Sequence, residues 1–178
     1  EHDAFVKALS TLGAEVYYVE KLVEDIIKDK KLKEELIKEH LRYSTIVDKE
    51  VIKIVHDYIE GLDARETVEV ITAGLSKDAV RNMKSHTSFS DLTKGSYPFY
   101  LDPMPSMYFT RDHGTVINKG LLLSQMFNFA RRRETIFLRF LQKYHPMFTN
   151  NNVSLWFEEE IPTGIEGGDV LVISHDTI

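Results

Sequence analysis

Apolar residues recur at helical spacing through the first half of the chain. Between Val51 and Leu62 they form a continuous stripe with a period near 3.6, and Asp48 stands at the position of an N-cap. This pattern predicts an amphipathic helix, and Gly13 is a typical stop for another helix before it. Shorter stripes predict further helices over residues 3–12, 22–27 and 32–37, and from Ala64 onward.

The second half of the chain mixes turn signals, short apolar runs and one strong helical stripe. Two apolar runs, 116–117 and 121–123, flank a turn sequence that begins at Asn118, which predicts a hairpin. The helical stripe runs from Phe129 to Tyr144 and should end before Pro146. Residues 85–95 are polar and predict a loop. Strands are predicted at residues 15–19, 107–110, 155–157 and 170–173, with Gly167-Gly168 as a turn before the last.

Composition narrows the class of protein. The chain has 178 residues, 43% of them hydrophobic and 28% charged, which is typical of a globular domain with a real core. A net charge of −6 argues against a nucleic-acid surface, and no apolar run approaches membrane-spanning length. The absence of Cys excludes disulfides, thiolate metal sites and a cysteine nucleophile within these residues.

The first candidate site is the segment that ends at Asp112, where a carboxylate follows an apolar run. A carboxylate can bind a guanidinium through two parallel hydrogen bonds. The alternative is a turn-capping Asp that pairs with its neighbour Arg111.

The second candidate site is the run of three arginines at 131–133, at the start of the strong helix. Arginine recognises carboxylates bidentately, and three positive charges at a helix N-terminus oppose its dipole. The alternative is a solvated helix start with an Arg–Glu pair.

The third candidate site is Glu166-Gly167-Gly168-Asp169, in which two acidic residues flank a Gly-Gly turn. Glycine permits a close approach of backbone, and the alternative is an ordinary hairpin turn. No two histidines stand at i, i+4, and no phosphate-binding or dinucleotide-binding glycine motif occurs. We therefore expect neither a metal nor a cofactor.

In this order, the three segments resemble the arginine deiminase family of guanidine-modifying enzymes. The Phe-Thr-Arg-Asp and Glu-Gly-Gly-Asp pair is the most specific part, and the resemblance runs over essentially the whole chain. The matching stretches are 1–5, 72–75, 102–105, 108–112, 131–135, 145–146 and 165–170.

The resemblance implies an α/β (α+β) fold, a partial, pentein-like α/β propeller with an inserted small helical bundle. It implies a propeller helix and strand over 1–19, the bundle over 20–84 and propeller modules over 85–178. The resemblance implies an N-terminal to central portion of the enzyme, and the absence of an initiator Met and the end just after an apolar run lead us to expect cut or disordered ends. The missing propeller modules would then come from the same chain, a second polypeptide or a homo-oligomer. We expect the protein to be cytoplasmic.

The resemblance also implies roles for single residues. Asp112 and Glu166 match the acidic groups that hold the guanidinium of L-arginine, and Arg131 matches the partner of its α-carboxylate. Phe109 matches an aromatic that lines the site, and Asp169 matches a residue that supports the loop. Ser106 stands where the family usually has an Asn that helps to hold the substrate carboxylate.

In the family, a Cys thiolate attacks the guanidinium carbon, a His acts as general acid and base, and citrulline and ammonia result. This chain contains neither the Cys nor the matching His motif, so we expect it to be inactive alone. His113-Gly114 also replaces the family's usual residues after Asp112. Two other hypotheses remain: a degenerate arginine-binding or interaction module, and a helical adaptor in which residues 1–84 bind a partner helix.

Overall fold

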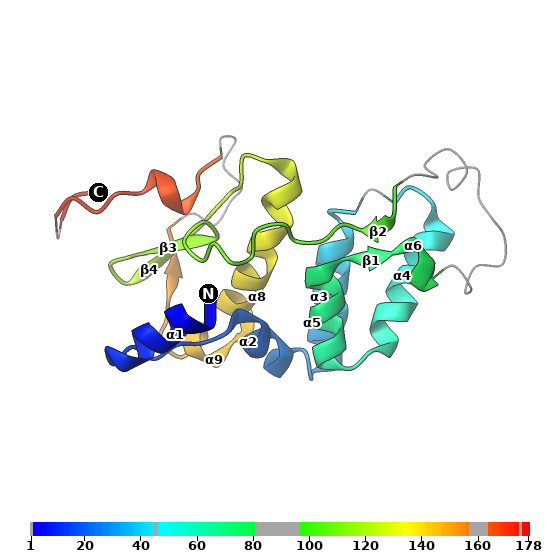
Figure 1. The fold of residues 1–178 in the computed structure, drawn as a ribbon, viewed down its shortest axis with the longest axis horizontal. Coiled ribbons are helices and arrows are strands. Elements are labelled where there is room, and N and C mark those ends of the chain that lie inside the picture. Colours follow the sequence, from blue (N-terminus) through cyan, green and yellow to red (C-terminus); the bar gives the residue numbers. More distant parts are fainter. Residues whose placement is uncertain (1, 45, 81–96, 157–163, 175) are drawn as a thin grey trace.

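The computed structural model describes the chain except residues 1, 45, 81–96, 157–163 and 175. Figure 1 shows α3, α4, α5 and α6 with β1 and β2 on the right, and α1, α2, α8 and α9 with β3, β4 and the C-terminus on the left. The predicted loop at 85–95 lies outside the described residues, as does Phe157 of the predicted strand 155–157. The helices are α1 (His2–Thr11), α2 (Val19–Ile26), α3 (Lys30–Leu41), α4 (Lys49–Gly61), α5 (Ala64–Ala73), α6 (Lys77–Val80), α8 (Ile136–Tyr144), α9 (Pro146–Thr149) and the 3-10 helices η2 (Phe129–Thr135) and η3 (Gly167–Asp169). The strands are β1 (Leu75–Ser76), β2 (Phe99–Leu101), β3 (Gly114–Ile117), β4 (Gly120–Leu123) and β5 (Ser154–Leu155).

The predicted helices of the first half are confirmed, and three of them begin at an Asp cap. Asp29 accepts hydrogen bonds from two backbone N–H groups at the start of α3, and Asp48 accepts one at 2.9 Å at the start of α4. Asp63 and Glu66 form a reciprocal capping box at the start of α5. These side chains satisfy backbone donors that the first helical turn cannot.

Two apolar cores hold the helices. The first joins α2, α3 and α5 to α8, and its centre is the fully buried Phe137. The second lies among α3, α4 and α6 and the β1–β2 pair, around Val55. Because the first core draws side chains from both the early helices and α8, packing ties the two halves of the sequence together. The three-part division of the chain at residues 19 and 84 stays a prediction.

Residues 114–155 form a β-β-α-β unit. The predicted hairpin is confirmed: β3 and β4 pair antiparallel, and Asn118 adopts a φ of 54° in the turn. The chain then passes through η2, α8 and α9 before β5 pairs parallel to β4. The sheet order is β3-β4-β5, so the helices are the crossover that a parallel pair requires. The mixed helix and sheet architecture agrees with an α/β fold, and the described residues contain no closed propeller.

Three predicted strands are wrong. Residues 14–18 have no regular structure and Val19 begins α2. Residues 107–110 lie in consecutive turns, where Phe109 N–H donates to the Ser106 carbonyl and Asp112 N–H to that of Phe109. Residues 170–173 also have no strand neighbour within the described part of the chain. A short apolar run becomes a strand only when another edge is available to bond it, which the run itself does not reveal.

The strong helix also differs from its prediction. Residues 129–135 form the 3-10 helix η2, and the α-helix proper begins only at Ile136. Pro146 starts the short α9 rather than only ending α8. Within the described ranges, no helix has both the length and the apolar character needed to cross a lipid bilayer.

A buried polar contact links the helical region to η2. Arg133 donates to Asp102 at 3.1 Å, and both side chains are largely buried. His40 of α3 lies beside this pair, is 2% exposed and has no hydrogen-bond partner for Nδ1 among the described residues. Burial, and then the nearby positive charge of Arg133, lower the pKa of His40 to about 4, although Asp102 acts in the opposite direction.

Gly74 is required where α5 turns into β1. Its φ is +82°, and a Cβ there would lie 2.7 Å from the Leu101 carbonyl oxygen and from the Pro103 nitrogen. Gly74→Ala should lower the free energy of unfolding by about 1–3 kcal/mol, because backbone must move to admit the methyl group. Gly61→Ala is the control: a Cβ there meets nothing within 4 Å, so urea unfolding should show little change. Equal stability of the two variants would contradict this reading of the α5–β1 junction.

The burial of His40 predicts an acid-sensitive fold. Its pKa is lower in the folded chain than the ordinary 6.5, so the unfolded chain binds more protons between pH 6.5 and about 4. The free energy of unfolding should therefore fall as the pH drops through that window, by on the order of 3 kcal/mol. His40→Gln should lack this component, which urea titrations of both proteins at a series of pH values would measure. Parallel pH curves for the two proteins would rule out a His40 contribution.

Candidate functional site

The three candidate segments converge on the guanidinium of Arg131. Its Nη2 donates to Asp112 Oδ2 at 3.0 Å, and its Nη1 lies 3.8 Å from Glu166 Oε2. Its Nε and Nη2 both donate to Glu134 Oε2, at 3.1 and 3.0 Å. Segments far apart in the sequence thus bring three carboxylates around one cation.

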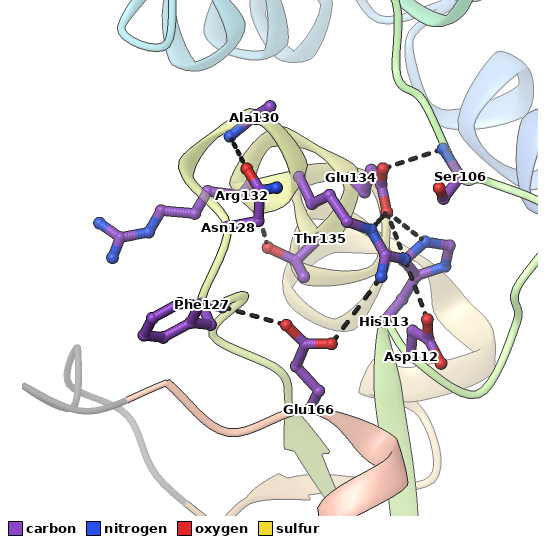
Figure 2. Close-up of polar contacts among 11 residues, drawn as sticks. Ser106, Asp112, His113, Phe127, Asn128, Ala130, Arg132, Glu134, Thr135 and Glu166 are labelled. Atoms are coloured by element: carbon purple, nitrogen blue, oxygen red, sulfur yellow. Dashed lines mark hydrogen bonds and ion pairs between the residues drawn. The ribbon is translucent and has the colours of Figure 1, made fainter.

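Glu134 is the buried centre of this cluster. It is 1% exposed, and its Oε1 accepts the backbone N–H of Ser106 at 3.0 Å. Its Oε2 also lies 3.2 Å from His113 Nε2. Figure 2 shows Glu134 lying between the Ser106 backbone and the His113 ring. A buried carboxylate needs such partners, because an unpaired one would be strongly destabilising.

The 3-10 helix explains why Arg131 and Glu134 act together. In a 3-10 helix, side chains at i and i+3 stand one above the other. Asn128 begins η2 by accepting the N–H of Ala130 at 2.9 Å. The sequence pattern suggested a solvated Arg–Glu pair as the alternative, but Glu134 is fully buried, Arg131 is partly buried, and the Arg131 guanidinium faces the other two carboxylates.

Glu166 is positioned by its own short segment. Gln125 and Ile165 exchange backbone hydrogen bonds at 2.8 and 2.9 Å, which fixes the segment beside the end of β4. Glu166 N–H donates to Asp169 Oδ2 at 2.8 Å, and Glu166 Oε1 accepts the N–H of Phe127 at 3.0 Å. Figure 2 shows the Glu166 side chain extended toward Phe127. Asp169 therefore orders the segment and Glu166 presents its second oxygen to Arg131.

Arg111 fixes the same segment from the opposite side. Its Nε and Nη2 donate to the carbonyls of Gly167 and Val170, at 3.1 and 2.6 Å. These contacts go to backbone, whereas the ion pair of Asp112 is with Arg131. Gly167 packs so closely that a Cβ would lie 1.8 Å from the Arg111 carbonyl oxygen. No side chain fits at position 167 unless the backbone of Arg111 or of the 166–169 segment moves.

The electrostatics of the cluster favour a cation. Partial burial disfavours the charge of Arg131, but the hydrogen bonds that it donates to Glu134 and Asp112 outweigh this effect and raise the pKa of Arg131 above its ordinary value. Three carboxylates against one guanidinium leave an excess of negative charge. Asp112 and Glu166 retain 28% of their side-chain exposure, so they are the accessible members.

One expected site residue, Phe109, stands apart from this charge cluster, and another, Ser106, contacts it through its backbone. The ring of Phe109 is 46% exposed and packs against Tyr108, with ring centroids 4.2 Å apart. Among the described contacts, none joins that ring to the carboxylates. The contact of Ser106 with Glu134 is made by its backbone N–H and not by its short side chain.

A groove of about 890 Å³ borders the cluster on the side of α2 and α5. Its walls include Tyr17, Tyr18 and Tyr108, and both His113 and Glu134 reach it. Sequence reasoning did not identify Glu134 or assign His113 a contact. The only signal for Glu134 was its place three residues after Arg131, and a buried ion pair cannot be distinguished from a solvated one by spacing.

One group of described side chains has the spacing of metal ligands, namely His56, Asp57 and Glu60 on α4. Asp57 and Glu60 are exposed, and Asp57 already pairs with Lys53. Exposed acidic groups of this kind are common without an ion, so the group does not define a site.

Comparison with known proteins points to one family. The family model described as arginine deiminase matches residues 1–178. Curated arginine deiminases from Bacillus cereus (strain B4264) and Listeria innocua serovar 6a are 37% and 35% identical over 178 residues. That alignment covers all of this chain but 43% of each relative. The chain therefore spans less than half the length of the curated relatives it matches.

The fit at Gly167 predicts a sharp contrast with its neighbour. Gly167→Ala should lower the free energy of unfolding by about 1–3 kcal/mol and displace Glu166, because the methyl group meets backbone. A Cβ at Gly168 meets nothing within 4 Å, so Gly168→Ala should stay within about 0.5 kcal/mol of the parent. Chemical denaturation measures both values. A neutral Gly167→Ala would show that Arg111 does not hold this segment.

Proposed function

Because this chain belongs to the arginine deiminase family, we propose that it forms the arginine-recognising part of an enzyme that converts L-arginine and water to L-citrulline and ammonia. The observation that carries the proposal is the pair Asp112 and Glu166, which face one guanidinium from two sides. These carboxylates come from separate segments, and each has its backbone fixed by hydrogen bonds.

The proposed recognition follows from the chemistry of arginine. A guanidinium stays protonated at any physiological pH and carries five N–H donors, so its site must offer anions. Asp112 and Glu166 provide them and keep part of their surface exposed. Arg131 provides guanidinium N–H donors for the α-carboxylate, and its position is fixed by hydrogen bonds to the buried Glu134.

The bond-breaking groups come from elsewhere in the proposed enzyme. The family mechanism needs a thiolate that adds to the guanidinium carbon and a His that protonates the leaving ammonia. The 178 residues include no Cys. Residues of the same polypeptide beyond these, or of a second polypeptide, must supply that chemistry, and this chain alone should yield no citrulline.

A second candidate function is a non-catalytic arginine-binding or interaction module. Ser106 and His113 favour it, because both depart from the usual family residues inside the site. Exposed apolar side chains at Leu171, Val172 and Ile173 also favour an interaction with another protein segment. Retention of the Asp112, Arg131 and Glu166 cluster favours the enzyme part.

Arginine binding tests the proposal directly. The chain should bind L-arginine in isothermal titration calorimetry, and Asp112→Asn should weaken that binding by about 10-fold or more, since it removes a charged hydrogen-bond acceptor. Asp25→Asn is the control, because Asp25 near the end of α2 is exposed and forms a local ion pair with Lys28, three residues later. Citrulline formation by the purified 178-residue chain would contradict the proposal that the nucleophile lies outside these residues. Equal L-arginine binding by Asp112→Asn and the parent chain would contradict the role of Asp112 in binding the guanidinium.

A further inference from the structure

We propose that Arg131 occupies the place of the ligand's guanidinium in the ligand-free chain, and that the ligand enters by exchanging ion-pair partners with it. This inference rests on the proposed function, because it uses the same site and names the ligand that the site selects. The ligand must carry a guanidinium at one end and a carboxylate at the other.

The geometry of Arg131 carries the first step. Its two terminal nitrogens face different carboxylates: Nη2 lies 3.0 Å from Asp112 Oδ2, and Nη1 lies 3.8 Å from Glu166 Oε2. These are the two groups proposed to hold the guanidinium of arginine. One guanidinium therefore already sits where a second one must bind.

Burial separates a fixed contact from exchangeable ones. The Glu134 side chain is fully buried, and its Oε2 accepts from both Nε and Nη2 of Arg131. Asp112 and Glu166 keep 28% side-chain exposure, and Nη1 is at ion-pair rather than hydrogen-bond distance from Glu166. Partly exposed pairs are weak and exchange readily, whereas breaking a buried pair is costly. Arg131 can therefore turn its terminal nitrogens away from Asp112 and Glu166 and vacate the space between them, while its Nε still donates to Glu134.

Charge decides which ligands complete the exchange. A ligand with a guanidinium and no carboxylate would bind Asp112 and Glu166. Arg131 would then face a second cation and would keep only Glu134 as an anionic partner. A ligand with an α-carboxylate returns an anion to Arg131, which matches its planar donor fork. The site should therefore favour L-arginine over agmatine, which has the same guanidinium and chain but no carboxylate.

Chemical rescue tests the stand-in role of Arg131. Arg131→Ala frees the carboxylates, so methylguanidinium should bind this variant at least about 10-fold more tightly than the parent chain and should raise its melting temperature. Arg132→Ala is the matched control, because Arg132 donates to the Met126 carbonyl and lies near the Phe129 ring rather than between carboxylates. Arg132→Ala should bind methylguanidinium no more tightly than the parent chain. Methylammonium at equal ionic strength should not raise the melting temperature of Arg131→Ala. The gain should disappear in Arg131→Ala combined with Asp112→Asn.

Each outcome of the rescue experiment decides the inference. Equal methylguanidinium binding by Arg131→Ala and the parent would overturn it. If Arg131→Ala is unfolded, its refolding by methylguanidinium would support the inference. If methylguanidinium does not refold it, Arg131→Gln is tested instead. A folded Arg131→Gln variant that binds no methylguanidinium would count against the inference.

Ligand preference in the parent chain separates this inference from the proposed function. L-arginine should bind at least about 10-fold more tightly than agmatine, and Arg131→Ala should lose that preference. Absence of L-arginine binding by the parent would count against the proposed function, while the methylguanidinium result would still decide the role of Arg131. L-arginine binding with equal affinity for agmatine would overturn the exchange and leave the proposed function standing.

Discussion

The candidate site depends on one constraint, the burial of a carboxylate at Glu134. A buried charge is tolerated only with several partners, and here they come from three places: the Ser106 backbone, the His113 ring and the Arg131 guanidinium. These contacts join the loop before β3 to the 3-10 helix before α8. Arg131, held in this way, extends to Asp112 and Glu166 and so defines where the other two charges meet.

The β-β-α-β unit gives this constraint its frame. The hairpin places Asp112 and His113 just before β3, the crossover delivers η2, and the bridge between Gln125 and Ile165 brings in Glu166. The backbone of Gly167 packs directly against that of Arg111, so position 167 has no room for a side chain. After this segment, the apolar side chains of Leu171, Val172 and Ile173 are exposed.

His113 and Ser106, where the resemblance implied other residues, both contact Glu134. His113 is buried against the carboxylate oxygen that also receives Arg131, so it contributes to the cluster rather than standing apart from it. Ser106 donates its backbone N–H to Glu134. Both residues therefore support the ion-pair cluster through Glu134.

The sequence by itself determined the early helices, the Asp48 cap and the β3–β4 hairpin, because periodicity, capping and turn chemistry act within a few neighbouring residues. It also indicated Asp112, Arg131 and Glu166 as candidates through their motifs. Tertiary structure decided that residues 15–19, 107–110 and 170–173 are not strands, because strand formation needs a partner edge that the run does not encode. It also decided that Glu134 is buried and that Arg131 faces both carboxylates, because ion pairing across 19 to 35 positions depends on packing rather than on spacing.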